Sequence, residues 1–291
     1  MNTLSRIALC SAITTSLIAC GGNDKNNNAT DSEDNLSQLT ITPTNLQALG
    51  ADYDYEGWII VDGSPVSTGT FDIENNQTVP ASFNLDGDMA ERATTFIVTI
   101  EPEVGDVPAP SAVHIIAGDL INGRTTAITN HESALATDFS GIEGRFILAT
   151  PTNGNATPTQ GIWYLDNSSG TAVAGLTLPT LPAGWQYEGW VVDDGPISTG
   201  TFTNVAMADS DGAGAAAGPS PGPDFPGQDF ITPALDLVGK TAVISVEPNP
   251  DNSSAPFSLK PLVAVIEQPS GPQEMTDNVA MTLPSALIVI Q

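Results

Sequence analysis

A duplicated block of residues constrains this chain more than any other feature of its sequence. Residues 55–71 and 187–202 both begin Tyr-Glu-Gly-Trp, continue through apolar residues into an Asp-Gly turn with a proline, and end Ser-Thr-Gly-Thr-Phe. The second block is one residue shorter, and the difference falls in the turn, where loops tolerate changes of length. Apolar residues on either side of a Gly/Pro turn are typical of a β-hairpin. The sequence therefore predicts the same hairpin twice.

The similarity continues beyond the hairpins. Residues 96–102 correspond to 242–248, and both segments are apolar runs that end in Glu-Pro. Upstream of the hairpins, residues 39–43 correspond to 176–179. Collinear matches of this kind indicate two copies of one domain. Because short apolar runs alternate with frequent turns, we expect an all-β chain built from two tandem β-sandwich-like domains.

The copies divide the chain into a first β-domain at residues 39–150 and a second at 161–291. The second copy is longer between its hairpin and its Glu-Pro strand, and the extra residues lie in a Gly/Ala/Pro-rich insertion at 209–225. We expect this insertion to be an exposed loop that buries little. Residues 145–149 and 286–290 are further strand-like runs, and each is expected to close its own copy.

The first residues resemble a bacterial lipoprotein export signal. Residues 1–19 carry one positive charge near the start, followed by an apolar run that ends just before Cys20. This run is too short to span a bilayer as a helix. The sequence Leu-Ile-Ala before Cys20 is similar to a lipidation motif, and we expect this cysteine to carry the lipid. The polar residues 20–38 are expected to form a flexible tether. By resemblance to the sorting rule of enteric bacteria, Gly21 favours the outer membrane over the inner membrane.

Charge excludes one class of partner. The chain has 34 acidic residues against 7 basic ones, with a net charge of −27. Nucleic-acid binding needs clustered Lys and Arg, so we expect no nucleic-acid partner. The protein surface is equally unsuited to an anionic bilayer, which leaves the lipid on Cys20 as the expected membrane contact.

The order of the repeated motifs resembles a known family. The pattern Tyr-x-x-Trp, a turn, Pro-Val-Ser-x-Gly and a later strand ending in Glu-Pro is similar to the extracytoplasmic C-terminal domain of the anti-sigma-K factor family. Members of that family also carry a cytoplasmic domain that holds the sigma factor and a transmembrane helix, and we find no counterpart of either here. The resemblance implies a fold and a binding or sensing role, but not inhibition of a sigma factor.

Few residues indicate chemistry. Asp209, Asp211 and Asp224 are weak candidates for a calcium site, because acidic loops supply the oxygen ligands that hard cations prefer. The competing interpretation is a solvated acidic insertion. The two histidines, His114 and His131, are not accompanied by a zinc-ligand cluster or a nucleophile motif.

The aromatic and acidic residues of the two blocks are expected to be structural, because a specific catalytic site is seldom needed twice. These residues are Tyr55, Glu56, Trp58, Tyr187, Glu188 and Trp190. We therefore expect a non-enzymatic envelope lipoprotein, without a cofactor, that binds or senses another envelope protein. The alternative is a protein that binds calcium or a small ligand through acidic loops.

Overall fold

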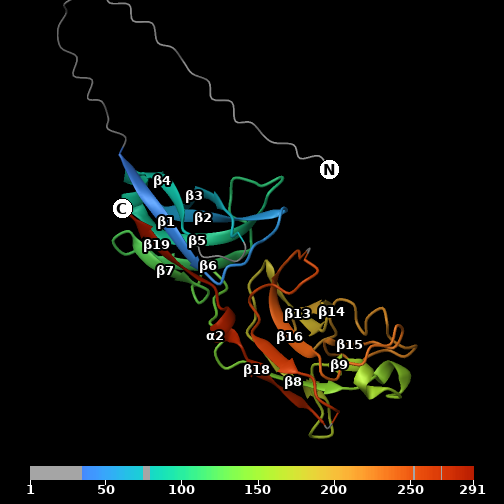
Figure 1. Ribbon diagram of the computed structural model, residues 1–291. Helices are drawn as coiled ribbons and strands as arrows, with labels where there is room; N and C mark the ends of the chain where they lie inside the picture. Colours follow the sequence, from blue (N-terminus) through green and yellow to red (C-terminus); the bar gives the residue numbers. More distant parts are fainter. Residues whose placement is uncertain (1–34, 75–78, 252, 270) are drawn as a thin grey trace, which may run out of the picture. The chain divides into compact units, whose positions relative to one another are not determined.

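The computed structural model describes residues 35–74, 79–251, 253–269 and 271–291. The expected signal peptide and Cys20 lie outside the described residues. The chain forms two large antiparallel sheets, shown in Figure 1, so the all-β fold with two domains expected from the sequence is confirmed.

The first sheet has eight strands and places the first hairpin at one end of the strand order. In spatial order the strands are β3 (Ser64–Phe71), β2 (Tyr53–Val61), β5 (Ala93–Pro102), β6 (His114–Asp119), β7 (Arg124–Ile128), β19 (Ser285–Ile290), β1 (Leu36–Thr44) and β4 (Ala81–Asp86). The two outermost strands, β3 and β4, come into contact, so the sheet curves almost into a barrel.

The second sheet repeats this order around the second hairpin. Its main path is β14 (Pro196–Phe202), β13 (Trp185–Val192), β16 (Thr241–Pro248), β17 (Leu262–Val265), β18 (Gln273–Asp277), β8 (Glu143–Leu148), β9 (Gly161–Trp163) and β15 (Gly227–Asp229). The short strand β12 (Leu176–Thr177) also pairs with β8, and β10 (Leu165–Asp166) pairs with β11 (Val173–Ala174). The outermost strands β14 and β15 are in contact here too.

The two closing strands lie in the opposite sheets from those expected. The C-terminal strand β19 pairs with β1 and β7 of the first sheet. Conversely, β8 pairs with β18 and β9 of the second sheet. Strands β19 and β8 occupy corresponding positions in the two sheets, as expected. Each strand, however, belongs to the sheet formed mainly by the other copy. The boundaries expected from the sequence, 39–150 and 161–291, therefore do not separate the strands of one sheet from those of the other.

Both hairpins share a local irregularity that explains their glycines. The register shifts beside Trp58 in β2 and beside Trp190 in β13. On the returning strands, Gly69 and Gly200 have φ angles of 112° and 101°. A Cβ atom at Gly69 would lie 2.8 Å from the Phe83 ring. The glycine of each Ser-Thr-Gly-Thr sequence is thus explained by a backbone conformation that favours glycine.

The ends of the described chain meet in the first sheet. Strand β1 begins at Leu36, so residues 36–38 of the expected tether belong to a strand instead. The amide of Gln38 donates to the carbonyl of Gln291 at 2.7 Å, and the amide of Gln291 donates to the carbonyl of Gln38 at 3.1 Å.

Helices are few and short in the described residues. Besides two single 3₁₀ turns, η1 (Pro151–Asn153) and η2 (Pro158–Gln160), they are α1 (Gly87–Arg92) and α2 (Val279–Thr282). Within the described part of the chain, no helix combines the length and apolar character needed to cross a membrane.

Candidate functional site

Each hairpin buries a glutamate next to a serine of the returning strand. Ser67 on β3 donates its hydroxyl to Glu56 Oε1, and Ser198 on β14 donates its hydroxyl to Glu188 Oε1. Glu56 and Glu188 are each 5% exposed. Such burial is costly for a carboxylate unless its oxygens find partners. The serine of each repeated block satisfies one oxygen of each glutamate.

The aromatic residues of the blocks also make matching contacts. Tyr187 donates its hydroxyl to the carbonyl of Pro179 at 2.7 Å and stacks on Phe202 at 5.7 Å between ring centroids. Tyr55 bonds the carbonyl of Gln47, likewise eight residues upstream, at 3.0 Å. These tyrosines are buried, with pKa values raised by burial.

The tryptophans connect each hairpin to the next strand. Trp58 Nε1 donates to Thr99 Oγ1 at 2.9 Å, and Trp190 Nε1 donates to Ser245 Oγ at 2.8 Å. In the second sheet the chain of bonds continues, because Ser245 donates its hydroxyl to Glu247 Oε1.

Glu247, the glutamate of the second Glu-Pro pair, is the main residue that the sequence reasoning did not single out. It is fully buried, and its Oε1 also accepts the amide of Phe257 at 2.8 Å. Glu188, Glu247 and Asp251 each place one carboxylate oxygen within 4.8 Å of the others. The duplicated Glu-Pro motif was a signal for Glu247, whereas no sequence signal marked the half-buried Asp251.

Burial changes the protonation of this acidic cluster. Desolvation raises the pKa of Glu188 to about 8, and the negative charges of Glu247 and Asp251 add to the effect. Desolvation also raises the pKa of Glu247 to about 7. The nearby Lys260 has its pKa lowered by burial, and its Nζ donates to the carbonyl of Phe257 at 2.6 Å. Near neutral pH the cluster can therefore hold protons or bind a cation.

The insertion is a loop, as expected, but its backbone is hydrogen-bonded to neighbouring segments of the second sheet. The amides of Gly218 and Ser220 donate to Thr152 Oγ1 and to its carbonyl, at 2.7 and 3.1 Å. The amide of Asp229 bonds the carbonyl of Ala213 at 3.1 Å, and the buried Asp229 carboxylate accepts Trp163 Nε1 at 2.9 Å. Small residues allow this segment to lie close against β9 and β15, where Gly222 approaches Trp163 and Gly214 approaches Gln228. No residue of the insertion is fully buried, so the difference from the expectation lies in its backbone bonds.

The three aspartates proposed from the sequence as cation ligands have different environments. Asp209 Oδ2 accepts the amide of Gly227 at 2.7 Å, and burial raises the Asp209 pKa to about 7. Asp211 and Asp224 are exposed. Among the described residues, these three aspartates do not form a group with ligand atoms within 4.8 Å of one another.

The histidines bond backbone atoms and a carboxylate. His114 Nδ1 lies 2.9 Å from the carbonyl oxygen of Ser133. His131 Nε2 lies 3.3 Å from Asp119 Oδ1, and His131 Nδ1 accepts the Ser133 amide at 3.1 Å.

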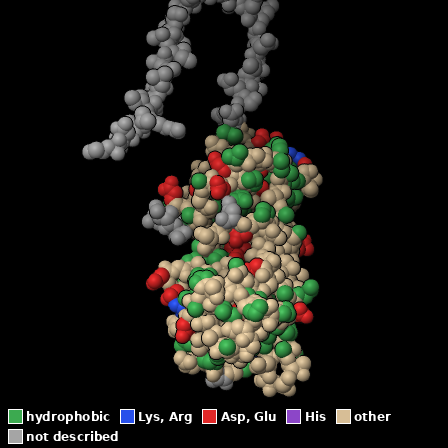
Figure 2. Space-filling view, turned by 90° about the vertical axis from the view of Figure 1, so that its right-hand side faces the viewer, with side chains coloured by type: hydrophobic (Ala, Val, Ile, Leu, Met, Phe, Trp, Pro, Cys, Tyr) green, Lys and Arg blue, Asp and Glu red, His purple; other side chains and the backbone are tan. Residues whose placement is uncertain are grey.

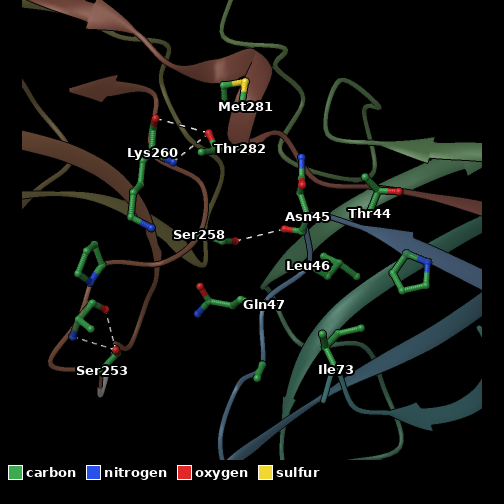
Figure 3. Close-up of a pocket in the computed structure, with 14 residues that line it drawn as sticks. Thr44, Asn45, Leu46, Gln47, Ile73, Ser253, Ser258, Lys260, Met281 and Thr282 are labelled. Carbon is green, nitrogen blue, oxygen red and sulfur yellow. Dashed lines mark hydrogen bonds between the residues drawn. The ribbon is translucent and has the colours of Figure 1, made fainter. Parts of the chain in front are cut away.

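A groove of mixed polarity lies beside the end of β1 (Figure 3). Ser258 Oγ donates to the carbonyl of Asn45 across it at 3.4 Å. Asn45 Nδ2 donates to the carbonyl of Leu283 at 3.0 Å. Met281, which is 77% exposed, lines the groove from α2. The groove is thus lined by backbone and amide groups together with an apolar side chain.

Residues 23–114 match the sequence model of the family described as anti-sigma-K factor rskA, C-terminal. The matched segment includes the first hairpin and ends at His114, the first residue of β6. The resemblance expected from the motifs is confirmed over this segment, and the second hairpin lies beyond it. Comparison with curated proteins and with solved structures gave no match.

Proposed function

We propose that this chain is a non-catalytic lipoprotein of the cell envelope that acts as a binding or sensory module. The match of residues 23–114 to the C-terminal part of an anti-sigma factor carries this proposal. It is supported by the sequence Leu-Ile-Ala-Cys ending at Cys20, which resembles a lipidation motif. The lipid on Cys20 anchors the chain, and Gly21 favours the outer membrane over the inner membrane.

The second sheet acts in this proposal as a second copy of the matched domain. The same strand order, the same serine-to-glutamate bond and the same tyrosine bond to a carbonyl eight residues upstream support this. Two copies on one anchor provide two binding surfaces, which increases the strength of attachment when both are occupied.

The partner that we propose is another protein of the envelope. The face shown in Figure 2 carries many acidic and few basic side chains, consistent with the net charge of −27. Such a surface repels nucleic acid and favours partners with basic segments. The groove beside Asn45 offers polar backbone groups next to Met281, and we expect an extended segment of the partner to bind there.

The anchor is tested with Cys20→Ser. Detergent phase partitioning of cells that express the full chain should place the wild type in the detergent phase. The serine variant should move to the aqueous phase, because the proposal has no other membrane attachment. Equal partitioning of both proteins into detergent would contradict the anchor.

The binding role is tested by site-specific photo-crosslinking in intact cells. A photoreactive residue at Met281, which lines the groove, should give a discrete crosslinked species. The control is Ile121, which is 72% exposed and does not line the groove. A crosslink at Met281 and not at Ile121 is the expected result. The absence of a species at Met281, or the same species at both positions, would contradict binding in the groove.

A second candidate function is cation or small-ligand binding by the acidic insertion. One observation favours it, because Asp209 Oδ1 is buried and has no hydrogen-bond partner in the described part of the chain. An added cation would satisfy this oxygen together with Asp211. A rise in melting temperature with calcium that disappears in Asp209→Asn would support this alternative.

A further inference from the structure

The acidic cluster of the second sheet joins three carboxylates from separate segments. Glu188 lies on β13, Glu247 lies near the end of β16, and Asp251 follows β16. One oxygen from each lies within 4.8 Å of the others. Oxygens bound to one Ca²⁺ at 2.3–2.6 Å are at most about 5 Å apart, so the spacing fits a shared ion.

Two of these side chains have an unsatisfied oxygen. Glu188 is 5% exposed and Glu247 is 0% exposed, so both are buried beyond nine-tenths. The Oε1 atoms accept serine hydroxyls, but Glu188 Oε2 and Glu247 Oε2 have no hydrogen-bond partner among the described residues. Buried oxygens of this kind are costly unless a proton, a donor or a metal satisfies them.

We propose that Glu188, Glu247 and Asp251 bind a hard divalent cation of the calcium class. All three ligands are carboxylate oxygens, which Ca²⁺ prefers, whereas zinc and the later transition metals favour nitrogen or sulfur. The half-buried Asp251 leaves one side of the site open, so water can complete the six to eight ligands that Ca²⁺ requires.

Lys260, the basic side chain whose charge acts on the cluster among the described residues, does not replace the cation. Lys260 is near enough for its charge to act on Glu247, but its Nζ donates to the carbonyl of Phe257 at 2.6 Å. One lysine also carries one positive charge against three carboxylates. The remaining negative charge is balanced by the divalent ion at neutral pH, and by protons when the pH falls.

The first sheet provides a natural comparison. Glu56 is as buried as Glu188, also accepts a serine hydroxyl, and also has an unpartnered Oε2. Glu101, the counterpart of Glu247, accepts the amide of Ser111 at 2.8 Å. Within the described ranges, however, Glu188, Glu247 and Asp251 are the only group of three that meets the ligand spacing. The proposal therefore places the cation in the second sheet alone.

The test uses the full-length protein in detergent after treatment with EDTA. Calcium at a hundredfold excess over its Kd should raise the melting temperature by about 5–10 °C, and calorimetric titration should give one site. Asp251→Asn should weaken calcium binding at least about tenfold, because the charge of the ligand set controls affinity. Its half-buried loop position makes it the variant that least disturbs the fold.

Glu188→Gln should weaken binding in the same way, and two control variants should not. Glu56→Gln removes an equally buried glutamate from the first sheet, and Asp209→Asn removes the competing candidate. The proposal is overturned by no thermal shift with either Ca²⁺ or Mg²⁺, by unchanged affinity in Asp251→Asn, or by loss of the shift in Asp209→Asn or Glu56→Gln. Because purified protein suffices, a negative result leaves the proposals on anchor and partner untouched.

Discussion

Replacing Ile288 by alanine should destabilise the first sheet, although Ile288 lies only three residues before Gln291. The side chain is 0% exposed and sits on β19, where it pairs with Ile41 of β1 and Thr125 of β7. Burial of an isoleucine contributes about 1.5–3 kcal/mol, and the cavity left by truncation adds to the loss. We expect the free energy of unfolding to fall by about 3–4 kcal/mol, a large share of the stability of an ordinary domain.

Hydrogen exchange followed by mass spectrometry locates this effect. Peptides from β1 (Leu36–Thr44) and β7 (Arg124–Ile128) should exchange faster in Ile288→Ala, whereas peptides from β18 (Gln273–Asp277) should change little. The matched control is Leu287→Ala on the same strand, because Leu287 is 44% exposed and should cost less than about 1 kcal/mol. Faster exchange confined to β18 and its neighbours would refute the strand exchange.

Three further predictions concern the second sheet. Deleting residues 212–223 should lower the free energy of unfolding in urea by at least about 3 kcal/mol, because several backbone bonds to the insertion are lost; an unchanged midpoint would contradict this. A fragment of residues 141–283 contains β8 and should unfold cooperatively by circular dichroism, whereas 161–291 lacks β8 and should not; the reverse result would contradict the observed pairing. In metal-free buffer, Glu188 should make stability fall by about 1.4 kcal/mol per pH unit between pH 5 and 7, because its pKa of about 8 in the folded protein exceeds its unfolded value of 4.5. Buried Glu247 and Asp209, with pKa values of about 7, add slopes of the same sign. Urea titrations across this range should therefore show that Glu188→Gln reduces the total slope by about the Glu188 share, and that the exposed Glu143→Gln retains the wild-type slope.

The hairpins were predictable because their information is local. A turn with Gly and Pro between apolar runs determines strand, turn and strand within a few residues. The positive φ of Gly69 and Gly200 explains why both blocks retain a glycine on the returning strand. The interpretation of the repeated blocks therefore gave the correct fold class.

The strand exchange was not predictable from the same pattern. Both β8 and β19 read as apolar strands, with alternating buried and exposed residues. Strand propensity describes how a residue fits a half-buried surface, but does not specify which neighbour provides that surface. Only the tertiary pairing distinguishes the two arrangements, so the sequence order suggested the wrong sheet for each strand.

The acidic cluster was half visible in the sequence. Glu188 attracted attention because it repeats Glu56, and the repetition suggested a purely structural role. Asp251 has no counterpart in a recognisable motif, and its approach to Glu188 depends on the loop after β16. Asp209 and Asp211, by contrast, attracted attention because they lie close together in the sequence.

The position of β19 also sets the order in which the molecule can be completed. Strands β1 and β7 precede most of the second sheet in the sequence, yet the strand between them, β19, follows it at Ser285–Ile290. Until residue 290 has emerged, the edges of β1 and β7 that face this gap have no partner, and open strand edges favour aggregation. A chain truncated before β19 would thus leave the first sheet unfinished, although most of that sheet is synthesised early.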